Sequence, residues 1–378
     1  MQNYKLTLVC DASDSYRCVR AANSLDINVA EKLTHEFNVS ADFETTYNVG
    51  LIVGASGSGK STFANHVFSE HLKSQAILDL DKTILDQMPE NLSYDDLADI
   101  LCGVGLSSVP CWIRPVKTLS NGQQFRAQVA LQIAHGQDVI IIDEWTSVVD
   151  RTVAKIMSHN IQKYIRKLGK KIILISCHYD VIEWLNPCWI VDCNQQSYTD
   201  RRSLWRDFKR LEQLKFCIKE IDGKSWKMFS KYHYLSKNVP GGKNYYYGLF
   251  LCDKQIGFQC FSNYVPRQKG KRMIYHSNRV VIHPDYCGIG LGIILINKCS
   301  QVLHDRFNGL IRVMSRSSSI PVYKSRIKYH FWVCQKIETR LKSSKTTLTY
   351  GTRAHVKMFL FEFIRSKYYD DKNITSAC

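Results

Sequence analysis

The strongest constraint on the fold is a glycine-rich segment, GASGSGKST at residues 54–62, that stands between a strand-like run and a helix-like run. Residues 46–54 before it are β-branched and apolar and end in glycine, which predicts a buried strand. The residues after it, FANHVFSEHL, carry apolar side chains at helical spacing. A strand, a glycine loop and a helix in this order predict an α/β sheet that holds an anion at the helix N-terminus.

The spacing inside this loop fits the pattern G-x-x-x-x-G-K-[ST] of phosphate-binding loops. Glycines let backbone N–H groups curl around phosphates, and Lys60 would bring an ammonium to the β- and γ-phosphates. The Ser61 hydroxyl is suited to ligate Mg²⁺. We therefore expect ATP and Mg²⁺ as cofactors, with contacts from Gly54, Ser56, Gly57, Gly59, Lys60, Ser61 and Thr62.

A second apolar run, residues 138–142, delivers two carboxylates to the end of a predicted strand. Ligands bind at the carboxyl ends of strands in open α/β sheets. Asp143 is suited to hold Mg²⁺ and Glu144 to polarise an attacking water. A third predicted strand, residues 171–176, ends just before His178.

The order of the remaining motifs resembles the nucleotide-binding domain of ABC-type ATPases. LSNGQ at 119–123 precedes the carboxylates and SVVD at 147–150 follows them. The resemblance implies that two such domains sandwich two ATP molecules, and hence a homodimer. It implies that Ser120 and Gly122 contact the γ-phosphate held by the partner, whereas His178 contacts it within its own domain. Asn121 stands where the family usually has glycine.

Two features of that family leave alternatives open. We interpret Gln87 as the Q-loop glutamine of that family and as a contact to ATP, although Gln123 and Gln124 are also available. An aromatic ring should stack on adenine, and the candidates are Phe37, Phe43 and Tyr47.

The short distance from the phosphate loop to LSNGQ predicts a reduced helical subdomain. No apolar run approaches the roughly 20 residues that a membrane span needs, so we expect a cytoplasmic protein without a membrane partner.

Charge divides the chain into two halves. Residues 1–200 hold 17 Lys and Arg against 23 Asp and Glu, whereas residues 201–378 hold 34 against 11. The resulting net charge of +23 on the second half predicts a surface for a polyanion such as nucleic acid. We expect an ABC-type ATPase domain over 1–197, a connecting helix over 198–211 and a second domain over 212–378.

The second domain is predicted to follow the order β-α-β-β-β-α-β, an α+β mixed sheet. Its segment CGIGLG at 287–292 lies between a strand and a helix and is similar to motif A of the GNAT acyltransferase family. The resemblance implies that backbone amides there hold the pyrophosphate of acetyl-CoA, although Cys287 stands at the usual Gln or Arg position. The implied acetyl-CoA contacts are Val281, Ile282, Gly288, Gly290, Leu291 and Gly292.

Acyl transfer to an amine needs a base and an acid. The family resemblance implies Tyr323 as the acid, and the candidate bases are His283, which is closest to the glycines, His276 and Tyr264. The segment WKMFSKYHYLS at 226–236 also resembles ABC-ATPase and acetyltransferase fusions and the Mom-type DNA-modifying proteins of phages. We interpret its aromatic and basic residues as a platform for nucleic acid, formed by Tyr232, His233, Tyr234 and Lys243.

The sequence therefore predicts an ATP-hydrolysing ABC-type ATPase fused to a GNAT-like N-acyltransferase that uses acetyl-CoA and modifies nucleic-acid bases. Two alternatives remain. The acceptors could be protein or small-molecule amines, or the chain could be an ATP-gated nucleic-acid-binding module with an inactive GNAT fold.

Overall fold

The computed structural model describes residues 1–9, 13, 15–24, 34–44, 46–201, 214–233, 238–263, 271–317, 320–329, 331–342, 354–364 and 374–376. The chain divides into two compact units. The first consists of residues 1–77 and 131–208, and the second of residues 78–130 and 209–378. The segment 78–130 thus groups with the second half of the chain, which differs from the continuous domain expected over residues 1–197.

The first unit is built on a five-stranded sheet of order β4-β5-β3-β6-β7. The first four strands in this order run parallel: β4 (Val139–Ile142), β5 (Lys171–Ser176), β3 (Val49–Val53) and β6 (Trp189–Asp192). Every residue of β3 and β4 is buried. Such continuous apolar strands are typical of parallel sheets covered on both faces, and they confirm the strands predicted at 46–54, 138–142 and 171–176.

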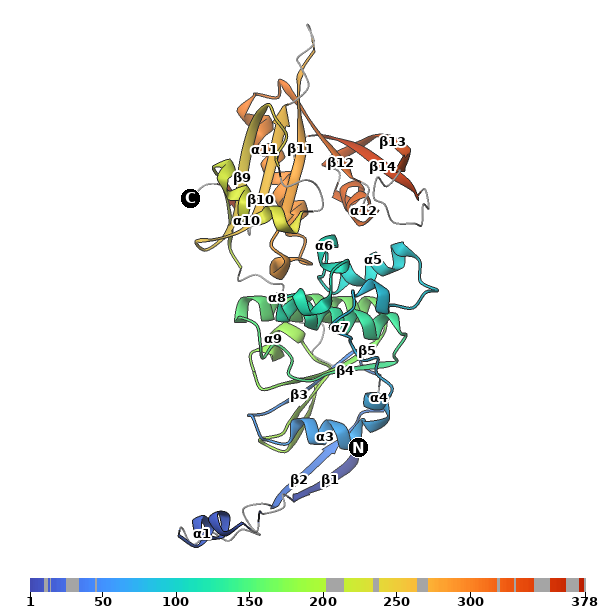
Figure 1. Ribbon diagram of the computed structural model, residues 1–378, viewed down its shortest axis with the longest axis vertical. Helices are drawn as coiled ribbons and strands as arrows, with labels where there is room; N and C mark the ends of the chain where they lie inside the picture. Colours follow the sequence, from blue (N-terminus) through green and yellow to red (C-terminus); the bar gives the residue numbers. More distant parts are fainter. Residues whose placement is uncertain are drawn as a thin grey trace. The chain divides into compact units, whose positions relative to one another are not determined.

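Helices surround this sheet within the first unit (Figure 1). They are α3 (Lys60–Val67), α4 (Ser69–Lys73), α8 (Arg151–Leu168) and α9 (Val181–Leu185). An antiparallel ribbon of β1 (Gln2–Val9) and β2 (Thr34–Ala41) and helix α1 (Tyr16–Ser24) belong to the same unit. Helix α7 (Asn121–Ala134) runs across the division between the units.

The predicted connecting helix over 198–211 is wrong at its start. Residues Ser197–Asp200 form strand β7, which pairs antiparallel with β6. The physical reason is tertiary: the Tyr198 ring packs among Phe43 and Trp189, and its hydroxyl donates to the carbonyl of Asp42 over 2.9 Å. This packing outweighs the local helical pattern. Residues 202–211 of the predicted helix lie outside the described residues.

The second unit contains an eight-stranded mixed sheet of order β13-β14-β12-β11-β10-β9-β8-β15. The pairs β11 with β12 and β8 with β15 are parallel, and the other neighbours are antiparallel. The strands are β8 (Phe216–Glu220), β9 (Lys243–Leu251), β10 (Lys254–Asn263), β11 (Met273–Ile282), β12 (Ile311–Ser317), β13 (Trp332–Lys342), β14 (Ala354–Phe363) and β15 (Ile374–Ser376).

Short helices and one long helix complete the second unit. α10 (Trp226–Phe229) and the 3₁₀ turn η5 (Ser230–Tyr232) follow β8, and α11 (Leu291–Arg306) contacts β10, β11 and β12 (Figure 1). The element order β8, α10, β9, β10, β11, α11, β12 matches the predicted β-α-β-β-β-α-β. A further helix, α12 (Ile320–Tyr329), follows β12.

The helical segment, as we name residues 78–130, contributes further short helices to the second unit. These are η1 (Leu85–Gln87), α5 (Tyr94–Gly103), α6 (Val109–Trp112) and η2 (Val116–Thr118). Helix α5 begins at a capping box between Ser93 and Asp96. Across the described residues, none of the helices combines the length and apolar character that crossing a bilayer requires.

Candidate functional sites

The phosphate loop, residues 54–62, is held in a curled conformation at the end of β3. Gly57 and Gly59 have φ angles of 80° and 83°, which glycine adopts without strain. A Cβ atom built on Gly57 would meet no other atom within 4 Å, so the curve is open there. The Lys60 ammonium donates to the carbonyl of Ala55 over 2.7 Å, and the Ala55 amide donates to Asn194 over 3.2 Å. The loop is therefore shaped in advance around a space suited to an anion.

The two predicted carboxylates lie at the same sheet edge as this loop. β4, β5 and β3 are parallel neighbours, so their carboxyl ends point the same way. Asp143 and Glu144 follow β4 and are exposed. The Glu144 amide donates to Asp143 Oδ1 over 2.7 Å, and Glu144 has a φ of 52°. This left-handed conformation is uncommon for a residue with a side chain and is often found at functional sites.

Hydrogen bonds join the ends of β4 and β5 beside these carboxylates. The Trp145 amide donates to the carbonyl of Ile175 over 2.7 Å, and the Ser176 hydroxyl donates to the carbonyl of Trp145 over 3.0 Å. The same hydroxyl accepts from the His178 amide over 3.1 Å. The His178 loop, as we name residues 177–180, follows β5. Since β5 lies between β3 and β4, the start of this loop lies between the phosphate loop and the carboxylates.

The oxygen donors at this edge fit a magnesium ion. Mg²⁺ prefers oxygen ligands and usually combines one or two protein groups with phosphates and waters. Ser61 offers a hydroxyl at the first turn of α3 and Asp143 offers a carboxylate, and both side chains are exposed. These residues would hold the ion that neutralises charge on the phosphates.

The signature motif, residues 119–123, lies where α7 begins. The Ser120 amide donates to Gln123 Oε1 over 3.1 Å, and Gln124 Nε2 donates to the carbonyl of Leu119 over 3.1 Å. Ser120 and Asn121 are exposed, whereas Gly122 is buried. The alternative glutamines Gln123 and Gln124 therefore hold this turn together.

The predicted Q-loop glutamine, Gln87, forms hydrogen bonds within its own loop. Its side-chain oxygen accepts from the Asp79 amide over 2.7 Å. Its side-chain nitrogen donates to the carbonyls of Asp79 and Thr83, each over 2.9 Å. The structure thus gives Gln87 a loop-stabilising role, and its contact with ATP stays a prediction.

The three aromatic candidates for adenine stacking all belong to the hydrophobic core of the first unit. Phe37 and Tyr47 are buried, and Phe43 is partly buried against them. The Phe37 ring lies 4.9 Å from Phe63, and the Tyr47 ring packs edge-on against Trp189. These rings serve the core, and the structure brings none of them to an exposed position.

The second predicted site, the glycine turn of residues 287–292, joins β11 to α11. Gly288 and Gly290 have φ angles of 97° and 83°, and Gly290 caps the start of α11. A Cβ atom on Gly290 would meet nothing within 4 Å, and one on Gly292 would meet only Ile282, at 3.7 Å. The space above the turn is therefore open.

The strands beside this turn separate. β11 and β12 pair in parallel only between Met273–Ser277 and Ile311–Ser315. β11 then continues to Ile282 paired with β10, while β12 pairs with β14. The part of β11 that leads to the glycine turn is therefore not paired with β12. Of the other predicted contacts, Val281 and Leu291 are buried in the core and Ile282 is partly buried.

The side chain of Cys287 contacts backbone that precedes the glycine turn. Its thiol makes long, weak contacts with the carbonyl oxygens of Ile282 and His283, at 3.8 and 3.6 Å. Burial raises the pKa of this thiol. Cys287 therefore has a structural role at this turn.

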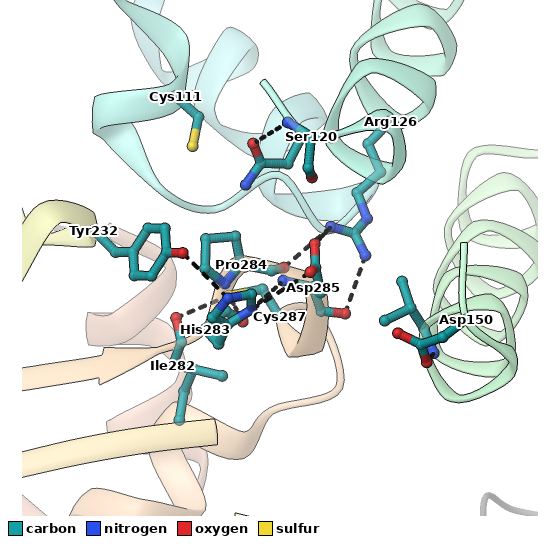
Figure 2. Close-up of polar contacts among 12 residues, drawn as sticks. Cys111, Ser120, Arg126, Asp150, Tyr232, Ile282, His283, Pro284, Asp285 and Cys287 are labelled. Atoms are coloured by element: carbon teal, nitrogen blue, oxygen red, sulfur yellow. Dashed lines mark hydrogen bonds and ion pairs between the residues drawn. The ribbon is translucent and has the colours of Figure 1, made fainter. Parts of the chain in front are cut away.

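A polar cluster lies directly before the glycine turn (Figure 2). The Tyr232 hydroxyl is 3.2 Å from His283 Nε2, and Asp285 Oδ2 is 3.5 Å from His283 Nδ1. Arg126 from α7, only 2% exposed, donates to the carbonyls of Pro284 and Asp285, each over 3.1 Å. Burial is the main cause that lowers the pKa of His283.

The structure does not bring the predicted acid Tyr323 into this cluster. Its ring stacks on Phe359 with centroids 4.2 Å apart and lies near Phe361. Both of these ring contacts are to residues of β14. The alternative base His276 lies on β11, and Tyr264 lies outside the described residues.

The predicted aromatic platform is largely part of the fold. His233 is buried with its ring edge-on to Trp226, and burial followed by the nearby Arg279 lowers its pKa to about 4. Lys243 is exposed, with its ammonium 5.7 Å from the Tyr245 ring centroid. Tyr234 lies outside the described residues. Tyr232 is a platform residue that joins the polar cluster, through its hydroxyl.

Sequence reasoning missed Arg126 and Asp285. Arg126 follows the signature motif but contacts residues 158 and 159 positions away, so no local pattern marks it. Asp285 stands two residues after His283, a spacing that could have been noticed as a carboxylate beside a candidate base.

Comparison with known proteins supports the class predicted for the first site. The Bacillus anthracis teichoic acids export ATP-binding protein TagH is 26% identical over 161 residues, which cover 37% of this chain and 29% of the relative. The Staphylococcus saprophyticus energy-coupling factor transporter ATP-binding protein EcfA1 is 29% identical over 180 residues, covering 38% of this chain and 66% of the relative. This chain thus spans less than two thirds of either protein.

A solved dimeric ATP-binding cassette bound to ADP and phosphate aligns with a TM-score of 0.36 and 17% identity, covering 44% of this chain and 92% of that chain. No protein-family model matches the chain. The relatives support an ABC-type nucleotide-binding domain in the N-terminal part of the chain.

Proposed function

We propose that the chain is an ATP-hydrolysing ABC-type ATPase joined to a GNAT-like N-acyltransferase. The observation that carries the ATPase is the shared sheet edge of the phosphate loop, the carboxylates Asp143 and Glu144, and the His178 loop. In this proposal Lys60 and the loop amides hold the phosphates, and Ser61 and Asp143 hold Mg²⁺. Glu144 polarises the attacking water, and His178 contacts the γ-phosphate.

The proposed ATPase acts as a homodimer. Ser120 and Asn121 are exposed at the start of α7, as a contact to a second copy requires. Ser120 and Gly122 would then complete the site around the γ-phosphate held by the partner. ATP binding would draw two copies together and hydrolysis would release them.

The proposed acyl transfer uses the glycine turn and the gap between β11 and β12. The open space at Gly290 and the separation of the two parallel strands support a site for the pyrophosphate and pantetheine of acetyl-CoA. In the reaction, the acceptor nitrogen bonds to the acyl carbon and the carbon–sulfur bond breaks. A protein base takes the proton of the amine, and the CoA thiolate is protonated as it leaves.

The proposed acceptor is an amino group on a nucleic-acid base. The net charge of +23 on residues 201–378 supports a polyanionic substrate. A base in a duplex must leave the stack before its amine can reach an acyl donor. Single-stranded nucleic acid is therefore the simplest substrate to test.

A direct experiment tests the acyl transfer. The full chain is incubated with acetyl-CoA, ATP and single-stranded DNA or RNA, which are then digested to nucleosides for mass spectrometry. One nucleoside is expected to gain the mass of an acetyl group. Unchanged nucleosides beside acetylated protein or small amines would move the acceptor to that second class.

A binding module with an inactive acyltransferase fold is the second candidate, favoured by two observations. Cys287 points its thiol at carbonyls of its own turn, and the Tyr323 ring packs on Phe359. The absence of any acetyl-CoA binding by calorimetry, together with ATP-dependent nucleic-acid binding, would favour this candidate.

A further inference from the structure

The polar cluster before the glycine turn has the form of a linear chain of proton-exchanging groups (Figure 2). The Tyr232 hydroxyl reaches one nitrogen of His283 at 3.2 Å, and the Asp285 carboxylate faces the other nitrogen at 3.5 Å. The two aromatic rings meet edge-on with centroids 5.0 Å apart. Such an order of hydroxyl, imidazole and carboxylate is able to move a proton from the outer oxygen to the ring.

The helical segment holds both ends of this chain. From α7, the buried Arg126 guanidinium donates to the carbonyls of Pro284 and Asp285, and its Nη1 is 3.9 Å from Asp285 Oδ1. Just before α6, the Ser108 hydroxyl donates to the backbone carbonyl of Tyr232 over 3.3 Å. The positions of Tyr232 and Asp285 are thus fixed from outside the sheet that carries His283.

The charges around His283 keep its ring able to accept a proton. Burial lowers its pKa most, the Asp285 carboxylate raises it, and the cations of Lys254, Lys231 and Arg126 lower it. The Tyr286 ring also packs against it, with centroids 5.9 Å apart. Because the pKa of His283 is lowered from its ordinary value, the imidazole is neutral near pH 7. The neutral ring is the form that a base needs.

We infer that Tyr232, His283 and Asp285 form a proton relay for the acceptor amine, held in place by Arg126. This inference rests on the proposed acyl transfer. As the amine nitrogen bonds to the acyl carbon, its proton passes to the Tyr232 oxygen while the Tyr232 proton passes to His283 Nε2. The carbon–sulfur bond breaks, and the same path returns the proton to the CoA thiolate.

Lys231 assists the outer end of the relay. Its ammonium lies 4.9 Å from the centroid of the Tyr232 ring. A cation at this place stabilises negative charge that develops on the phenol oxygen. Tyr232 is then the catalytic residue, His283 acts through it, and Asp285 and Arg126 are positioning residues.

The relay requires one of the two neutral tautomers of the His283 ring, the one with its proton on Nδ1. The Asp285 carboxylate needs a proton on Nδ1, whereas the Asp285 amide, 3.4 Å from Nδ1, needs a lone pair there. The relay uses the form with Nδ1–H, because Nε2 then accepts from Tyr232. The protonated nitrogen is therefore a property that an experiment reads directly.

Nitrogen NMR tests the relay. It uses the full-length protein with isotope-labelled histidine, without ATP or acyl donor. The His283 signals are assigned with a His283→Gln variant and followed over pH in wild type, Tyr232→Phe and Tyr286→Phe. Tyr286 is the matched control because its ring also packs against His283, whereas the hydroxyl at His283 Nε2 is that of Tyr232. We expect a proton on Nδ1 in wild type, a shifted Nε2 signal in Tyr232→Phe alone, and a lower His283 pKa in Asp285→Asn.

Acyl transfer gives the second readout. Tyr232→Phe is expected to slow transfer by about 100-fold, the usual size of an acid–base contribution, with Tyr286→Phe near wild type. His283 signals that are the same in Tyr232→Phe and wild type, or a proton found on Nε2, would overturn the relay. Failure of wild type to transfer any acyl group would overturn the proposed function, and NMR would still judge the relay by itself.

Discussion

Nη1 of Arg126 donates to the carbonyl oxygen of Pro284 over 3.1 Å, joining positions 158 residues apart. Arg126 lies on α7, six residues after Ser120 at the start of the signature motif, and Pro284 begins the turn that leads to Gly290. The guanidinium is buried, so its bonds form in a poorly hydrated environment where they are strong. The helix that begins at the signature motif is therefore physically tied to the glycine turn.

Replacing Arg126 by methionine is expected to destabilise the second unit. The carbonyls of Pro284 and Asp285 would lose their donors, and a buried acceptor without a partner costs about 1–3 kcal/mol. We expect the free energy of unfolding to fall by roughly 3 kcal/mol, measured by urea denaturation. Arg126→Lys should recover only part of the loss, because an ammonium lacks the planar fork that serves two carbonyls.

Lys117→Met is the matched control for Arg126. Lys117 lies on the same helical segment and pairs with Asp81, but both side chains are exposed. Water screens such an exposed pair, so its loss should change stability little. Equal losses in Arg126→Met and Lys117→Met would mean that the buried arginine does not anchor the turn.

Two substitutions in the phosphate-loop site are expected to stop ATP turnover for different reasons. Lys60→Ala removes the ammonium that we propose binds the phosphates, so it should abolish nucleotide binding in a fluorescent-ATP assay. Glu144→Gln removes the group that polarises water, so hydrolysis should fall on the order of 100-fold while ATP still binds. Phosphate release measures the rate.

Lys73→Ala serves as the control for this pair. Lys73 is an exposed lysine near the end of α4, away from the loop in sequence. Its loss should leave both binding and hydrolysis unchanged. Normal turnover in Lys60→Ala or Glu144→Gln would place the active site elsewhere.

Local patterns in the sequence predict much of the fold. The apolar runs that form β3, β4 and β5 are short and continuous. Their composition alone therefore predicts buried strands. The order of elements from β8 to β12 is predicted in the same way, from short apolar runs and helical spacing. The roles of the individual site residues stay predictions.

Long-range contacts are what the sequence does not predict. Tyr198 reads as part of a helix, yet its ring is drawn into a strand by Phe43 and Trp189. His233 reads as a residue for nucleic acid, yet it packs against Trp226. The sequence shows how aromatic side chains are spaced along the chain. It does not show which residues far away in the sequence pack against them.

Gly290 and Gly292 form a matched pair for the glycine turn. Gly290 has a φ of 83° and open space around it, whereas a Cβ on Gly292 would meet Ile282 at an ordinary 3.7 Å. Gly290→Ala is expected to cost about 1–2 kcal/mol of unfolding free energy through backbone strain alone. Gly292→Ala should be nearly neutral, because no positive φ is required there.

Acetyl-CoA binding by these two variants tests cofactor contact separately from backbone strain. Calorimetry should show weaker binding for both variants, since a methyl group at either position narrows the approach to the backbone amides. A Gly290→Ala variant with wild-type stability would contradict the strained conformation. Wild-type affinity in both variants would contradict a cofactor site at this turn.

The buried His233 is expected to make folding stability depend on pH. Its pKa is lowered to about 4, against about 6.5 in an unfolded chain, by burial and then by Arg279. Between these values the unfolded chain binds a proton that the folded chain does not, so stability falls as pH drops from about 6.5 through 4.

The test compares variants by urea denaturation across this pH range. His233→Asn should flatten the slope of unfolding free energy by up to about 1.4 kcal/mol per pH unit, the value for one proton. The exposed His71 provides the control, since its replacement by asparagine should leave the slope as in wild type. The other histidines with lowered pKa, His159, His276 and His283, keep part of the slope in every variant. An unchanged slope in His233→Asn would show that this ring is hydrated and charges freely in the folded protein.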